Sequence, residues 1–145
     1  MAEFSRPQYR VDILKVGMQV NLEFVEGSPA VTDEILHNRS DAKAHFRRAA
    51  ELVSVPFIYL SEGVSNETFR FGLGLVAETG VRFSGVLCGR ATWEDGVAIF
   101  VEEGLAALEQ WLARDGVRNV QSVHQRLSAA TPWFASHGIS AVNRG

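Results

Sequence analysis

The chain has 145 residues, of which 46% are hydrophobic, and its formal net charge is −3. That length gives room for one ordinary domain with a hydrophobic core. The weakly acidic balance does not favour nucleic acid as a partner, and no apolar run approaches the roughly 18 residues of a membrane-spanning helix. A single cysteine, Cys88, excludes an internal disulfide and suits a reducing compartment. We therefore expect a cytoplasmic domain that binds neither nucleic acid nor membranes.

The first predicted strand covers residues 11–16, a compact apolar run interrupted by Asp12 and Lys15. By residue type alone, a solvent-facing lysine is the more common outcome at such a position, because lysines are mostly exposed. After a turn-rich connection, Ser40 is expected to cap a helix at residues 41–53, which carries apolar residues on one face.

The second unit begins at Pro56 with residues 57–60, a short aromatic and β-branched run that is typical of a buried strand. Ser65 is expected to cap a helix over residues 66–79, and Gly80 to end it. The third unit repeats this order. We expect a strand at residues 81–87, then a turn.

Thr92 is the expected N-cap of the next helix, residues 93–103. A further helix is predicted at residues 105–114, which Asp115 and Gly116 are expected to end, and another from about residue 119 to 130.

Strand–loop–helix units in series indicate parallel strands with crossover helices. Small residues after the second and third strands allow backbone N–H groups to converge on an anion, and Arg90 adds a positively charged guanidinium group. In eight-stranded α/β barrels the loops after strands seven and eight commonly hold a phosphate group. We therefore expect a phosphate site on these two loops.

Two segments, Tyr-Leu-Ser-Glu-Gly-Val-Ser at residues 59–65 and Gly-Val-Leu-Cys-Gly-Arg-Ala-Thr-Trp at residues 85–93, resemble the class I aldolases, and more narrowly the tagatose-1,6-bisphosphate aldolase family. A third segment, Tyr-Arg-Val-Asp-Ile-Leu-Lys-Val at residues 9–16, resembles the strand that carries the Schiff-base lysine in that family. The similarity runs from about residue 3 to residue 133.

The resemblance implies a lyase that cleaves tagatose 1,6-bisphosphate to glycerone phosphate and glyceraldehyde 3-phosphate through a lysine Schiff base. It implies that Lys15 is the nucleophile, whereas Lys43 lies on a polar helix face. It implies that the substrate phosphate is bound by Ser61, Glu62, Gly63, Leu87, Cys88, Gly89 and Arg90. The family is independent of metals and cofactors, and the four scattered histidines form no metal motif.

Because a complete (βα)8 TIM barrel needs about 250 residues, we expect an α/β fold that is only part of one. The chain would supply about the last three βα units and C-terminal helices, the C-terminal half of a longer protein, over residues 1–133. Residues 134–145 would be a loosely held tail. The open edge of a partial barrel invites a homo-oligomer.

The chain departs from the family pattern after the lysine, where Gly17 and Gln19 replace a glutamate and a proline. We expect the loss of a carboxylate two residues from Lys15 to alter the pKa or the orientation of that lysine. Two alternatives stay open beside the aldolase. One is a half barrel that binds sugar phosphates without catalysis, and the other is an aldolase for another phosphorylated ketose.

Overall fold

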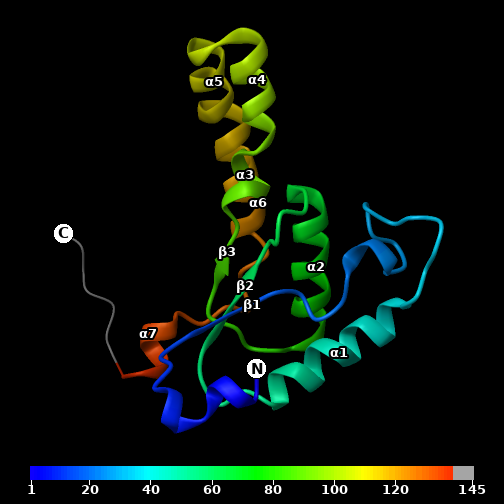
Figure 1. The fold of residues 1–145 in the computed structure, drawn as a ribbon, viewed down its shortest axis with the longest axis vertical. Coiled ribbons are helices and arrows are strands. Elements are labelled where there is room, and N and C mark those ends of the chain that lie inside the picture. Colours follow the sequence, from blue (N-terminus) through cyan, green and yellow to red (C-terminus); the bar gives the residue numbers. More distant parts are fainter. Residues whose placement is uncertain (139–145) are drawn as a thin grey trace.

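A computed structural model describes residues 1–138 of the chain. Its centre is a parallel three-stranded sheet in the order β1-β2-β3 (Figure 1), formed by β1 (Leu14–Val16), β2 (Phe57–Leu60) and β3 (Val86–Leu87). The expected parallel α/β arrangement is therefore confirmed. The three strands form an open sheet, which is compatible with part of a barrel, and that this sheet belongs to a (βα)8 barrel stays a prediction.

Helices follow each strand along the chain. They are α1 (Arg39–Glu51), α2 (Asn66–Thr79), α3 (Gly89–Trp93), α4 (Asp95–Glu103), α5 (Leu105–Trp111), α6 (Val117–His124) and α7 (Trp133–Ser136). A π-helical turn, Leu112–Gly116, joins α5 to α6, so the expected stop at Asp115 and Gly116 is wrong. Short 3-10 turns lie at Glu3–Ser5, Pro7–Tyr9 and Leu22–Phe24. No helix of residues 1–138 is both long and apolar enough to cross a membrane.

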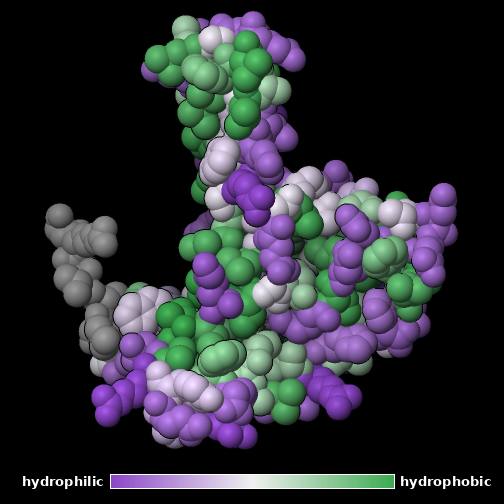
Figure 2. Space-filling view, viewed as in Figure 1, coloured by the Kyte–Doolittle hydropathy of each residue, from purple (hydrophilic) through white to green (hydrophobic). Residues whose placement is uncertain are grey.

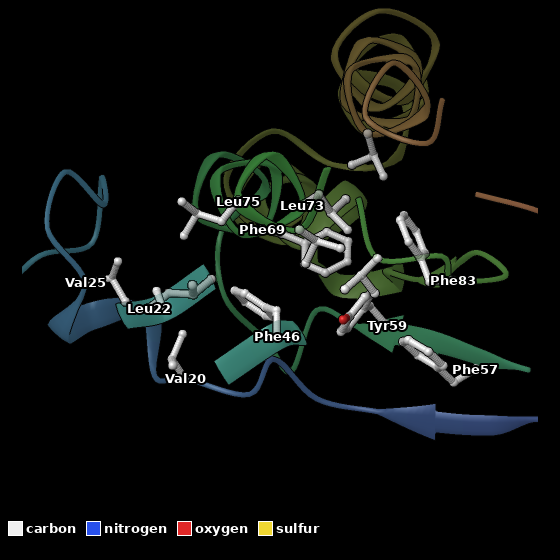
Figure 3. Close-up of a cluster of buried hydrophobic side chains, with 14 of the residues drawn as sticks. Val20, Leu22, Val25, Phe46, Phe57, Tyr59, Phe69, Leu73, Leu75 and Phe83 are labelled. Atoms are coloured by element: carbon white, nitrogen blue, oxygen red, sulfur yellow. The ribbon is translucent and has the colours of Figure 1, made fainter. Parts of the chain in front are cut away.

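The hydrophobic core lies between one face of the sheet and the helices α1 and α2 (Figure 3). Tyr59 of β2 is fully buried at its centre, where its ring meets those of Phe46, Phe57 and Phe83 edge to face at centroid distances of 5.4 to 6.2 Å. Such pairs add roughly 0.5–1.5 kcal/mol each beyond their burial. This packing fixes which face of the sheet meets the helices.

Within residues 1–138, the opposite face of the sheet is the less covered one. Side chains alternate along a strand, and Lys15 pairs in register with Ile58, while Leu60 pairs with Leu87. These four residues therefore share the face opposite Tyr59. Lys15 and Leu87 are exposed, and Ile58 and Leu60 are only partly buried. We call this surface the open face.

Several local signals are confirmed. Ser65 accepts a hydrogen bond from the N–H of Thr68 and caps α2, and Gly80 ends α2 in the left-handed conformation with φ +73°. Two expected caps are wrong. Asn38 rather than Ser40 caps α1, through the N–H of Asp41. Thr92 lies inside α3, where its hydroxyl donates to carbonyl oxygens of the preceding turn.

Helices α4 and α5 form an antiparallel hairpin that projects from the body of the molecule (Figure 1). Its surface is rich in hydrophobic side chains (Figure 2), including Val101, which is 76% exposed, and Leu105, which is 61% exposed. Of the expected tail, residues 139–145 lie outside the described residues. The part before them begins in α7.

Candidate active site

Lys15 lies in the middle of β1 on the open face, not toward the helix layer. Its exposure follows from the alternation of β1, in which Leu14 and Val16 pack against the core and the residue between them points the other way. In a closed barrel this face would be the interior. Lys43, the second lysine of the sequence, lies instead on α1 and forms an ion pair with Glu78 at 3.2 Å.

The two expected phosphate loops are neighbours in space. The N–H of Ser61, directly after β2, donates to the carbonyl oxygen of Leu87 at the end of β3, at 3.2 Å. Ser61 is buried, and its own carbonyl accepts from the N–H of Val64 at 3.1 Å, which closes a tight turn. Both loops follow the carboxyl ends of parallel strands, the side of α/β sheets where ligands bind.

Arg90 and Gly63 connect these two loops. Gly63 has φ +89°, and a Cβ atom there would lie 3.0 Å from Nη2 of Arg90. The guanidinium therefore lies directly over the turn after β2. Within residues 1–138, Arg90 forms no ion pair with a carboxylate, so its positive charge is available to an anion.

Glu62 reaches the other way, toward the segment after β1. Its carboxylate accepts a hydrogen bond from the N–H of Met18 at 3.1 Å. A Cβ atom at Gly17 would collide with both carboxylate oxygens. Glu62 itself has φ +55°, which is uncommon for a residue other than glycine, so the turn holds it in a strained conformation. The loop residue expected to hold phosphate thus contacts the chain two residues beyond Lys15.

Gln19 ties the same segment to the core. Its side-chain oxygen accepts a hydrogen bond from the Tyr59 hydroxyl at 3.2 Å, and its side-chain amide donates to the Gly17 carbonyl at 2.8 Å. Burial of the Tyr59 hydroxyl raises its pKa above the ordinary range. The structural role of Gln19 was not foreseen from the sequence. Its only signal there was its place in the departure from the family pattern.

Cys88 and Gly89 begin the third loop. Burial raises the pKa of the half-buried Cys88 thiol, which argues against a reactive thiolate. A Cβ atom at Gly89 would lie 3.3 Å from the indole nitrogen of Trp93, which places an N–H donor beside this loop. Sequence reasoning missed Trp93 as a site residue, although it closes the resembling segment.

The site therefore offers an amine, a carboxylate and a guanidinium from three adjacent strands and their loops. Strands β1 and β3 are two strand spacings apart, roughly 10 Å. A hollow of about 300 Å³ lies between the segment after β1 and the loop after β2, with Ser61 and Glu62 in its lining. In the part of the chain that the structure describes, no three His, Cys, Asp or Glu side chains gather as metal ligands would.

No family model matches the chain. Among curated proteins, it is 44% identical to tagatose 1,6-diphosphate aldolase 2 of Enterococcus faecalis over 147 aligned residues, covering 100% of this chain and 43% of that protein. It is 40% identical to tagatose 1,6-diphosphate aldolase of Listeria monocytogenes, covering 94% of the chain and 40% of the relative. It is 42% identical to tagatose 1,6-diphosphate aldolase 2 of Streptococcus pyogenes, covering 92% of the chain and 40% of the relative.

The chain thus spans about two fifths of the length of these relatives. The similarity extends well beyond the three segments from which the family was predicted, and the prediction of the family is confirmed. By its sequence, this chain belongs to the tagatose 1,6-diphosphate aldolase family.

Proposed function

We propose that this chain forms the Schiff-base and phosphate-binding part of a class I aldolase that cleaves tagatose 1,6-bisphosphate. The observation that carries the proposal is the position of Lys15. It lies on the open face of a parallel sheet whose next two strands end in the adjacent loops of Ser61 and Arg90. The names of the relatives supply the substrate.

In this proposal the amine of Lys15, in its neutral form, attacks the ketose carbonyl and forms an iminium with loss of water. The iminium accepts the electron pair of the C3–C4 bond as that bond breaks, and the C4 hydroxyl gives its proton to a base, so that C4 becomes the aldehyde carbon. Glyceraldehyde 3-phosphate leaves, and the enamine that remains on Lys15 is protonated and hydrolysed to glycerone phosphate. No metal or other cofactor takes part in these steps.

Arg90 would bind the phosphate next to the carbonyl through charge-assisted hydrogen bonds. Ser61, Gly63, Cys88 and Gly89 would contribute through the loops they form, and Trp93 through its indole N–H. The position of the Arg90 guanidinium over Gly63 supports this role, because it places the charge over the turn that follows β2.

The open face exposes Leu87 and Lys15 to solvent, and a buried barrel interior would cover them. We propose that the remaining strands of a (βα)8 barrel cover this face, supplied by a longer polypeptide in the cytoplasm or by a second copy of the chain. Either arrangement would also pair the free edges of β1 and β3.

Reductive trapping tests the lysine. The chain is incubated with glycerone phosphate and sodium borohydride, digested, and analysed by mass spectrometry. We expect an adduct on the peptide that contains Lys15, absent from Lys15→Ala and present in Lys43→Ala. An adduct that persists in Lys15→Ala would refute the assignment of the nucleophile.

A second candidate is a half barrel that binds sugar phosphates without turnover, which the position of the Arg90 guanidinium over Gly63 also supports. It predicts binding of glycerone phosphate by calorimetry, its loss in Arg90→Ala, and no trapped adduct. The third candidate, an aldolase for another phosphorylated ketose, rests on Gly17 and Gln19, where the chain departs from the family pattern. A panel of ketose bisphosphates on the complete enzyme separates it from the first.

A further inference from the structure

The space beside Gly17 is filled by a side chain from another part of the chain. Both carboxylate oxygens of Glu62 occupy the volume that a Cβ atom at position 17 would need. The φ angle of Gly17 lies outside the left-handed region, so the backbone there would accept an ordinary residue. The lack of a side chain at position 17 is therefore what admits the carboxylate of Glu62.

Gly17 follows β1 directly, so strand alternation continued by one residue would put this carboxylate on the side of Lys15. Side chains two residues apart in an extended segment point to the same face, about 6.6 Å apart along the strand. By this alternation, a Cβ atom at Gly17 and the side chain of Lys15 are expected to leave the chain in the same direction. Within residues 1–138 no ion pair joins Lys15 to Glu62, but the four-carbon stem of lysine is long enough to cover one such step.

The segment between the two groups is held in place. The hydrogen bond from the Met18 N–H fixes the Glu62 carboxylate, and the bonds of Gln19 to Tyr59 and to the Gly17 carbonyl fix the backbone. The contacts of Gly17 and Gln19 therefore join β1 to β2 and its loop, and they leave a negative charge at the end of the β1 segment.

We propose that Glu62 is the positioning residue of Lys15: its carboxylate, brought from the loop after β2 into the space beside Gly17, attracts the lysine ammonium and turns the side chain toward the phosphate loops. The proposal rests on the proposed function of Lys15. It also assigns to Glu62 a role other than that of a phosphate ligand, since a carboxylate repels the phosphate dianion that Arg90 attracts.

Competitive acylation tests the proposal without requiring an iminium. The chain is treated with a trace of acetic anhydride at neutral pH, and the modification rates of Lys15 and Lys43 are compared by mass spectrometry. Because these are the two lysines of the sequence, Lys43 is an internal reference. In Glu62→Gln we expect the Lys15 rate to rise roughly threefold relative to Lys43, since the amide keeps the acceptor for the Met18 N–H but lacks the charge that attracts and restrains the lysine side chain.

Three further variants separate charge from structure. Glu62→Asp should keep most of the wild-type ratio. Glu67→Gln, an exposed carboxylate in the first turn of α2, should leave it unchanged. The double variant Gly17→Glu/Glu62→Ala should restore it by placing the carboxylate on the other side of the same space. An unchanged ratio in Glu62→Gln would overturn the proposal, even if borohydride traps Lys15, and a raised ratio would support it even if no adduct forms.

Discussion

The guanidinium of Arg90 lies against the α-carbon of Gly63, so closely that a Cβ atom at position 63 would lie 3.0 Å from Nη2 and 3.1 Å from Cζ. The two residues come from the loops after neighbouring parallel strands. Because Gly63 also has φ +89°, it serves both the turn and the approach of the charged side chain.

We expect Gly63→Ala to weaken phosphate binding about as much as Arg90→Ala, because the methyl group displaces the guanidinium. Calorimetry with glycerone phosphate measures the affinity. The variant should also lower the free energy of unfolding by roughly 1 kcal/mol, since alanine is disfavoured at positive φ.

Gly80→Ala is the matched control. Gly80 has a similar φ of +73°, but a Cβ atom there would meet nothing within 4 Å. It should show the same loss of stability with unchanged affinity for glycerone phosphate. Equal affinities in Gly63→Ala and the wild-type chain would contradict the role of this contact.

The strand–loop–helix order was predictable because each boundary carries a local signal. Residues 57–60 and 66–79 match β2 and α2 at both ends, since Pro56, Ser65 and Gly80 define them chemically. The expected strand at residues 81–87 shrinks to Val86–Leu87, because Gly85, with a positive φ of +141°, interrupts the extended backbone directly before them.

The candidate site could be predicted only as a set of separate loops. Small residues and Arg90 indicated an anion-binding site, and the family resemblance indicated Lys15. The contact of Glu62 with Gly17 joins residues 45 positions apart, and no local sequence pattern encodes such a contact. The face on which Lys15 lies was likewise undecided until the aromatic packing around Tyr59 fixed the orientation of the sheet.

The α4–α5 hairpin depends on Gly96, where a Cβ atom would lie 2.9 Å from the ring of Trp111. We expect Gly96→Val to force these helices apart and to destabilise the hairpin by roughly 1–3 kcal/mol. Hydrogen exchange should show loss of protection in α4 and α5 while β2 and α2 keep theirs. Gly74→Ala, in a helix position with nothing within 4 Å, should instead be neutral or stabilising. Loss of protection throughout the chain would show that the hairpin does not unfold locally.

Glu78 of α2 joins α1 through Arg39 at 2.8 Å and Lys43 at 3.2 Å. The hydrogen bond from Lys43 and the charge of Arg39 lower the pKa of Glu78, so the ion pairs stabilise the fold above the ordinary glutamate pKa and lose this effect as the pH falls below it. Because the groups are largely exposed, Glu78→Gln should cost less than about 1 kcal/mol. Urea denaturation should show the loss at low ionic strength and not in 1 M salt, with exposed Glu51→Gln as control. An equal loss in both buffers would argue against an electrostatic origin.

The pH dependence of stability, compared between variants of the buried Tyr59 and the exposed Tyr9, tests the burial of Tyr59 in the core. Burial raises the pKa of Tyr59 in the folded state, whereas the unfolded chain ionises this group near its ordinary pKa of about 10. Above that pH the unfolded state binds fewer protons than the folded state, so the free energy of unfolding should fall as the pH rises, by up to about 1.4 kcal/mol per pH unit. Below it, this group contributes no pH dependence.

Tyr59→Phe removes this ionisation and should flatten the decline in stability above pH 10. At neutral pH the same variant should cost about 0.5–1.5 kcal/mol, because the Gln19 oxygen loses its hydrogen-bond donor. Tyr9→Phe is the control, since Tyr9 is 42% exposed and its hydroxyl donates to the exposed Glu3. Urea denaturation between pH 7 and pH 11 measures both effects. A decline that is as steep in Tyr59→Phe as in Tyr9→Phe would mean that another group, and not the buried tyrosine, limits stability in alkali.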